Sequence, residues 1–268
     1  MRYRSLILVI VPWIVAAGSG CMTIGQQPNL LTTAQEKQLG ANLSKQVVKQ
    51  EKVLANPGIQ QYVNQIGQRL ARQSPRKDVS YEFTVIDAPK TINAFALPGG
   101  HLFVYTGLLK LCDNEAELAS VMAHEIAHVA AYHHGETLTR QFGINLLLNA
   151  ALGDNPSSAA KVTADLLSTA GAMKFSRDQE READAMGMDM LFRAGYRPEA
   201  MVDFMEKMYA VERQRGSAPA LPFLSSHPAT AQRIAALKQE TLRYPVDLRM
   251  KSPVYANRYR QEVLNKLN

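Results

Sequence analysis

The chain has 268 residues, 46% hydrophobic and 20% charged, which is ordinary for a globular protein and predicts a sizeable core in one large domain or two small ones. Its formal net charge of +6 is compatible with an anionic partner such as a membrane surface. Because the basic residues are spread out, with no basic stripe interleaved with aromatic residues, we exclude a nucleic-acid partner.

The first twenty residues have the organisation of a secretory signal. Two arginines precede an apolar run at positions 6–17, and small residues follow it. The run contains Pro12 and is shorter than the roughly twenty residues that a membrane-spanning helix needs. We therefore predict that residues 1–20 form a cleaved signal peptide.

Cys21 follows Gly-Ser-Gly at the end of this segment, and the arrangement resembles the acylation site of bacterial lipoproteins. Gly18 stands where that pattern usually has Leu, so an ordinary cleaved signal or an uncleaved anchor is the alternative. The residue after Cys21 is Met22, and not the Asp found in the pattern that retains lipoproteins in the inner membrane, so the outer membrane is favoured. We expect a lipid anchor on Cys21 in the outer membrane, with residues 22–268 forming a single periplasmic domain.

Cys112 is the other cysteine of the chain. A secreted protein with one remaining thiol has no disulfide framework. Because Cys112 lies among leucines, we predict that it is a small buried hydrophobic residue.

Two amphipathic helices are predicted after the signal. Apolar residues recur at helical spacing across residues 32–54 and 59–73. Thr33 and Glu36 form a capping-box pattern at the start of the first helix. An Asn-Pro-Gly sequence separates the two helices.

Three β-rich runs follow, at residues 79–87, 92–97 and 101–107. The turn sequences APKT and PGG separate them. We therefore predict a small sheet with at least one hairpin.

The rest of the chain is predicted to be mostly helical. Asp113 or Asn114 caps the next helix, with a capping box between Asn114 and Glu117, and the helix ends near Gly135. Further helices are expected around 142–152 and at about 160–173, 177–194, 198–213 and 228–241. The predicted fold class is α+β, with the small sheet next to the capped helix.

Three ionisable residues stand among alanines, valines and isoleucine in the middle of that helix. His124 and His128 stand four apart, so their directions differ by only about 40° and both imidazoles can bind one zinc ion. Glu125 points aside and can act as a general base on a water at the metal. Two core histidines bonded to carbonyl groups are the alternative interpretation.

A later charged helix offers the third protein ligand that a catalytic zinc site needs. Glu180 and Asp184 share one helix face, whereas Glu182 lies about 200° away from Glu180 and is expected in solvent. Asp184 can then accept a proton from the second nitrogen of a ligand histidine. A merely charged helix surface is the alternative.

The H-E-x-x-H motif, the segment SRDQEREAD and the segment SHPATAQR together resemble the zinc metallopeptidase family of HtpX, the CAAX prenyl protease, BepA and LoiP. The resemblance covers roughly residues 30–240, including the hairpin NAFALPGGHLFVYTGLL. It implies a zincin-like domain with one zinc ion per chain, in which Glu180 is the third ligand. Short periplasmic lipoproteins such as LoiP are most similar, because no spanning helices or long C-terminal helical repeats are expected.

His227 and Arg233 match the family pattern H-P-x-x-x-x-R, which implies that His227 lies beside the metal. It then stabilises the oxyanion or occupies the open zinc position, whereas a capping or surface role is the alternative. Arg233 is expected nearby, although a structural ion pair explains it equally well. His133 and His134 are expected to end the zinc helix, where a cation complements the helix dipole.

Asn93 and Ala94 are the residues that we expect on an edge strand facing the substrate. Such a strand binds an extended polypeptide through main-chain hydrogen bonds. Half of a core hairpin is the alternative.

We therefore expect a periplasmic zinc endopeptidase with polypeptide substrates. The resemblance implies that it cleaves misfolded or misassembled envelope proteins, with the envelope assembly machinery as a candidate partner. An envelope chaperone or assembly factor with a closed or structural metal site is the first alternative. A metal-dependent hydrolase of small amides is the second.

Overall fold

The structure is a computed structural model that describes residues 29–152, 156–168, 173–216 and 220–267. The predicted signal peptide and Cys21 lie outside the described residues. Among the described residues, no helix combines the length and the apolar character needed to cross a membrane.

Helices α1 (Thr33–Gln50) and α2 (Pro57–Ala71) form where the apolar spacing predicts them. The capping box of α1 lies one residue earlier than predicted, because the Thr32 side chain accepts a hydrogen bond from the Gln35 N–H and the Gln35 side chain accepts one from the Thr32 N–H. Glu36 is instead buried and pairs with Arg76. The prediction that Glu36 completes the box was therefore wrong.

A three-stranded sheet consists of β1 (Glu82–Ile86), β2 (Ala94–Ala96) and β3 (His101–Tyr105), in the order β1-β3-β2. Strand β3 pairs parallel with β1 and antiparallel with β2, so the predicted hairpin is confirmed. A short 3-10 helix, Pro98–Gly100, makes the hairpin turn. Gly99 has φ of 78° and Gly100 has φ of 102°, a conformation that a side chain disfavours.

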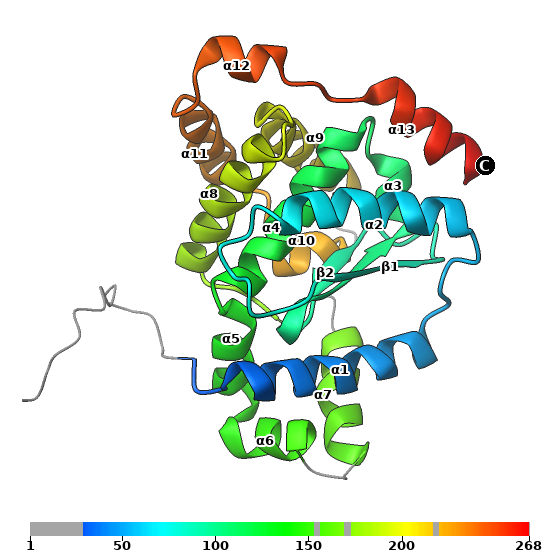
Figure 1. The fold of residues 1–268 in the computed structure, drawn as a ribbon, viewed down its shortest axis with the longest axis vertical. Coiled ribbons are helices and arrows are strands. Elements are labelled where there is room, and N and C mark those ends of the chain that lie inside the picture. The colour runs from blue at the N-terminus through cyan, green and yellow to red at the C-terminus, as the bar shows by residue number, and fades with distance from the viewer. Residues whose placement is uncertain (1–28, 153–155, 169–172, 217–219, 268) are drawn as a thin grey trace, which may run out of the picture.

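The sheet separates two apolar cores. On one face, Phe83, Val85 and Val104 pack in the core that includes residues of α2 and of helix α4 (Glu115–Ala130). On the other face, alternate residues such as Phe103 pack with α1 and with the helices α6 (Ile144–Leu152) and α7 (Pro156–Ser168). Figure 1 shows α1, α6 and α7 together at one end of the molecule, next to the sheet. The observed architecture is the predicted α+β fold.

The long helix predicted to end near Gly135 is two helices, α4 and α5 (His133–Phe142). Tyr132 has φ of 60°, a left-handed conformation that ends α4 and redirects the chain. Arg76 stabilises this turn, because its guanidinium lies 4.0 Å from the centroid of the Tyr132 ring and donates a hydrogen bond to the carbonyl of Val129. At the other end of α4, the Asn114 side chain accepts from the Glu117 N–H, as predicted.

The second half of the described chain covers α4 with further helices. Helices α8 (Arg177–Arg193) and α9 (Glu199–Arg215) pack against α4, and α11 (Ala231–Thr241) packs against α8 and α9. The helix expected from residue 228 begins three residues later, since Thr230 is the capping residue. The remaining short helices are α3 (Thr106–Leu111), α10 (Pro222–Ser226), α12 (Val246–Lys251), α13 (Ala256–Glu262) and a 3-10 turn, Leu264–Lys266.

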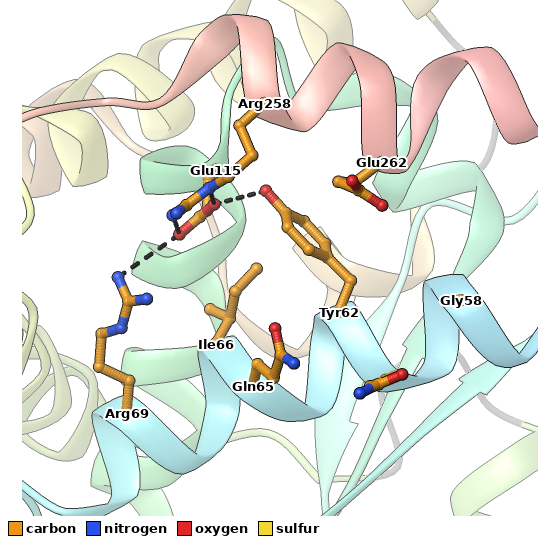
Figure 2. Close-up of a pocket in the computed structure, with 9 residues that line it drawn as sticks. Gly58, Tyr62, Gln65, Ile66, Arg69, Glu115, Arg258 and Glu262 are labelled. Carbon is orange, nitrogen blue, oxygen red and sulfur yellow. Dashed lines mark hydrogen bonds and ion pairs between the residues drawn. The ribbon is translucent and has the colours of Figure 1, made fainter.

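The buried carboxylate of Glu115 connects the first turn of α4 to α2 and α13 (Figure 2). It accepts hydrogen bonds from the hydroxyl groups of Tyr62 and Tyr196, the second at 2.6 Å. Arg258 from α13 donates two more, one of them at 2.7 Å. The C-terminal helix is therefore fastened to the start of the helix that carries the histidines.

Candidate metal centre

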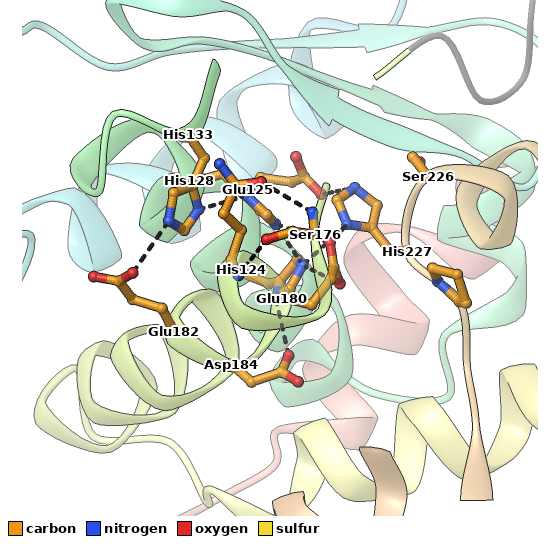
Figure 3. Close-up of polar contacts among 12 residues, drawn as sticks. His124, Glu125, His128, His133, Ser176, Glu180, Glu182, Asp184, Ser226 and His227 are labelled. Carbon is orange, nitrogen blue, oxygen red and sulfur yellow. Dashed lines mark hydrogen bonds and ion pairs between the residues drawn. The ribbon is translucent and has the colours of Figure 1, made fainter. Parts of the chain in front are cut away.

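Four buried side chains from three separate segments meet beside α4 (Figure 3). His124 and His128 come from α4, Glu180 comes from α8, and His227 directly follows α10. One nitrogen or oxygen atom from each of them lies within 4.8 Å of the others. The structure thus brings together the three predicted metal ligands and His227.

The spacing of these atoms suits one metal ion. His128 Nε2 lies 3.0 Å from His124 Nε2 and 3.4 Å from Glu180 Oε1. His227 Nδ1 lies 3.2 Å from His124 Nε2 and 2.8 Å from Glu180 Oε1. Four ligand atoms placed tetrahedrally around zinc are roughly 3.3 Å apart. Three imidazoles and one carboxylate therefore fit Zn²⁺ in chemistry and in spacing.

The protonation states of His128 and Glu180 suit a cation. His227 differs, because, although burial acts in the opposite direction, the charges of Glu180 and Glu125 raise its pKa. Burial lowers the pKa of His128 well below its usual range, so the ring is neutral and one of its nitrogens has a free lone pair. Burial alone raises the pKa of Glu180, but the charges of His227 and Arg233 hold that pKa well below its usual value. Glu180 is therefore a carboxylate at neutral pH.

Asp184 lies behind His124, and Arg233 lies beside both, with its Nη2 3.4 Å from Nε2 of His124. Asp184 Oδ1 is 3.1 Å from Nδ1 of His124. Arg233 donates to both carboxylate oxygens of Asp184, at 2.7 Å each, and its Nη1 lies 2.6 Å from Glu180 Oε2. Although burial acts in the opposite direction, Arg233 lowers the pKa of Asp184. An ionised Asp184 at this place suits a proton on Nδ1 of His124, which leaves Nε2 for a metal.

Glu125 lies beside the four donor atoms. Its Oε2 accepts a hydrogen bond from the N–H of Ala96 at 3.1 Å, and its Oε1 lies 3.3 Å from Nε2 of His227. Burial raises the pKa of Glu125, and the neighbouring histidines His227 and His124 oppose this shift. A carboxyl group with a raised pKa next to the ligands can exchange a proton during a reaction.

Asn93 and Ala94 were predicted to face a substrate, but their main-chain groups point to opposite sides of β2. Within the described residues, β2 is an edge of the sheet. The Asn93 carbonyl accepts a hydrogen bond from the N–H of Tyr105, so the main chain of Asn93 faces β3. The direction of the backbone N–H and C=O groups alternates along an antiparallel pair, so the groups of Ala94 and Ala96 point away from β3. Ala94 therefore presents its main chain at the outer side of the edge, where Ala96 meets Glu125.

Two residues beside the ligands have positions that differ from the sequence-based expectation. His133 was expected to be a cation at the end of α4, but it is buried in the first turn of α5, and burial lowers its pKa. Its Nδ1 lies 3.0 Å from Nδ1 of His128. Glu182 was expected in solvent, but its half-exposed carboxylate lies 3.4 Å from Nε2 of His133. The dipole interpretation of His133 was therefore wrong.

His134 and Phe175 also lie close to the ligands. His134 is buried, and burial lowers its pKa to about 3, so it is not the predicted cation. The Phe175 ring stacks on His128, with 3.9 Å between the ring centroids. Phe175 precedes the helix cap Ser176, and no sequence pattern marks such a residue as a neighbour of a metal ligand. The contact between Phe175 and His128 was therefore not predicted.

Comparison with known proteins agrees with this geometry. The family described as Peptidase family M48 matches residues 57–241. The beta-barrel assembly-enhancing protease of Escherichia coli (strain K12) is 32% identical over 260 residues, which cover 87% of this chain and 52% of that protein. The mitochondrial metalloendopeptidase OMA1 of Schizosaccharomyces pombe is 37% identical over 180 residues, which cover 66% of this chain and 52% of that protein.

The chain thus spans about half the length of these curated relatives. The matched family region contains every residue of the four-donor cluster as well as Glu125. By sequence and by site, the chain belongs to peptidase family M48.

Proposed function

We propose that this chain is a zinc-dependent endopeptidase that cleaves misfolded or misassembled polypeptides of the bacterial envelope. The observation that carries the proposal is the position of Glu125 beside a cluster of zinc-binding atoms. A purely structural metal site has no use for such a carboxylate. Membership of a peptidase family supports the same reaction class.

His124, His128 and Glu180 would hold the zinc ion, which supplies polarisation of the scissile carbonyl and a lowered pKa for water. Glu125 accepts the proton of the attacking water and passes it to the leaving amine. Asp184 and Arg233 hold His124 in the orientation that directs Nε2 to the cluster.

An extended substrate would lie along the outer side of β2. Ala94 offers main-chain groups for pairing there, and Ala96 is already bonded to the carboxylate of Glu125. Pairing by main-chain hydrogen bonds aligns a peptide without reading its side chains. This suits unfolded substrates of diverse sequence.

The cellular setting is a further part of the proposal. Residues 1–20 act as the signal peptide, Cys21 carries the lipid, and residues 22–268 form one domain held at the periplasmic side of the outer membrane. The apolar run before Cys21 supports this arrangement. The similar Escherichia coli protein is named for enhancing β-barrel assembly, which supports envelope assembly as the source of substrates.

A second candidate is an envelope chaperone whose metal site stays closed. Its support is His227, because Nδ1 completes a set of four protein donors like that of a structural zinc site. Glu125 favours the peptidase over this candidate, since a closed site needs no general base.

The proposal is tested by incubating the purified protein with unfolded outer-membrane β-barrel protein, with and without a chelator. We expect one zinc ion per chain in elemental analysis, cleavage that stops with the chelator, and recovery on adding zinc. A zinc-loaded protein that binds the unfolded substrate without cutting it would support the chaperone instead.

A further inference from the structure

The ligand His128 is backed by a second histidine rather than by a carboxylate. Its Nδ1 lies 3.0 Å from Nδ1 of His133, while its Nε2 faces the other donors of the metal cluster. The Nε2 atom of His133 lies 3.4 Å from the carboxylate of Glu182 on α8 (Figure 3). The three side chains therefore form a line that ends at the metal-binding atom.

The break between α4 and α5 creates this line. In an unbroken helix, a residue five positions after His128 would point about 140° away from it. The left-handed conformation of Tyr132 interrupts α4 and turns His133 back onto His128. Arg76 holds the turn through the Tyr132 ring and the carbonyl of Val129.

The hydrogen-bonding capacity of the three groups determines where the protons lie. If Nε2 of His128 offers its lone pair to a metal, its proton is on Nδ1. That proton points to Nδ1 of His133, which must accept it and therefore carries its own proton on Nε2. The His133 Nε2–H then faces the carboxylate of Glu182. In this arrangement each N–H of His128 and His133 faces an acceptor, and Nε2 of His128 keeps its lone pair for the metal.

We propose that His133 is a positioning residue for metal binding, which fixes the tautomer and ring orientation of His128 and connects this ligand to Glu182. The inference rests on the metal site of the proposed function. The two ligand histidines are thus supported differently. His124 faces the buried Asp184 directly, whereas His128 reaches a half-exposed carboxylate through another imidazole.

The experiment measures the zinc dissociation constant by competition with a chromophoric chelator, and records the visible absorption spectrum of the Co²⁺-substituted protein. Neither readout depends on catalysis. His133→Phe removes the acceptor and should raise the dissociation constant about 10- to 100-fold, the usual cost of losing a group that supports a metal ligand. The Co²⁺ spectrum should change as well. His133→Asn places an oxygen near the former Nδ1 and should recover most of the affinity.

Two matched controls separate this role from general packing. Thr137→Val replaces a buried residue of α5 whose hydroxyl has no hydrogen-bond partner among the described residues, and it should leave the affinity and the Co²⁺ spectrum unchanged. Glu182→Gln should weaken zinc binding by a smaller factor than His133→Phe, because its carboxylate is half-exposed. Asp189→Asn removes another half-exposed carboxylate of α8, which pairs with Arg193, and should have no effect.

A folded His133→Phe protein with the zinc affinity and Co²⁺ spectrum of the parent would overturn the inference. If His133→Phe does not fold, the zinc affinities of Glu182→Gln and Asp189→Asn are compared instead. Equal affinities of these two variants would overturn the inference. A parent protein that binds no zinc would instead overturn the proposed metal site itself. The two failures are therefore distinguishable.

Discussion

The Nδ1 atom of His227 lies 2.8 Å from Oε1 of Glu180. The other nitrogen of the same ring, Nε2, lies 3.3 Å from Glu125. The imidazole thus stands between the metal-binding atoms and the proposed general base. A catalytic zinc site keeps one position open for water and substrate, and His227 lies where a fourth ligand would lie. We infer that this arrangement is a resting one, and that the ring must move before a substrate is cut.

Replacing His227 by alanine tests this inference. The three remaining donors should retain the zinc ion, and cleavage of an unfolded substrate should rise severalfold, because the position next to Glu125 is no longer filled. Ser226→Ala is the matched control, since the Ser226 hydroxyl bonds only to carbonyl groups of its own helical turn among the contacts described. A loss of activity in His227→Ala would indicate that the ring stabilises the oxyanion instead.

The edge strand gives a second prediction. Ala94→Pro removes an N–H that points away from β3, so the sheet should persist, as proline is tolerated at such edge positions. Losing one main-chain hydrogen bond to an extended substrate should lower kcat/KM about two- to tenfold. Zinc content should be unchanged. Phe95→Pro removes an N–H that faces β3 and should unfold the hairpin. Unaltered cleavage by a folded Ala94→Pro protein would exclude this path for the substrate.

The buried carboxylate of Glu115, which holds α13 against the start of α4, gives a third prediction. Glu115→Gln keeps the shape of the buried side chain but removes the charge that Arg258 and two tyrosines bond. We expect the free energy of unfolding to fall by about 1–3 kcal/mol in urea titrations. Glu262→Gln, in an exposed pair with Lys266, should change it by less than about 0.5 kcal/mol. Equal effects of the two substitutions would show that the buried cluster contributes no special stability.

Cys112 gives a prediction of pH dependence. Burial raises the pKa of its thiol above the ordinary value of about 8.5. Because the thiolate is the reactive form, native protein should react with iodoacetamide on the order of tenfold or more slowly than unfolded protein. The raised pKa contributes stability that is fully present below about pH 8.5 and is lost as the pH rises toward the folded pKa. Compared with Cys112→Ala, the parent should lose stability more steeply between about pH 8 and 10. Rapid labelling of the native thiol would contradict its burial.

Local rules were sufficient to predict much of the fold and of the metal cluster. The four-residue spacing of His124 and His128 places both rings on one helix face, and the structure has them there. The same rule separates Glu180, which joins the cluster, from Glu182, which does not. The hairpin followed from its Pro-Gly-Gly turn, because such a turn needs positive φ angles.

The arrangement behind His128 was not predictable by these rules. A tyrosine in a left-handed conformation has no sequence signal, and its energetic cost is offset by contacts with Arg76, which lies far away in the chain. Without that break, His133 points away from His128, so its role could not be inferred from spacing. The capping box failed for a similar reason, since a distant arginine pairs with Glu36. Long-range contacts of Arg76 overrode the local patterns in both places.

In the proposed mechanism, Glu125 transfers protons and does not hold the metal. Glu125→Gln keeps the size of the side chain and an oxygen that can accept the hydrogen bond from Ala96, but it cannot take a proton from water. The most direct measurement is the rate at which zinc-loaded Glu125→Gln protein cleaves an unfolded envelope protein, with zinc content determined in the same sample. We expect full zinc occupancy and a rate lower by about 10²- to 10⁴-fold, the usual contribution of general acid–base catalysis. A zinc-loaded Glu125→Gln protein that cleaves as fast as the parent would contradict the proposed role of Glu125.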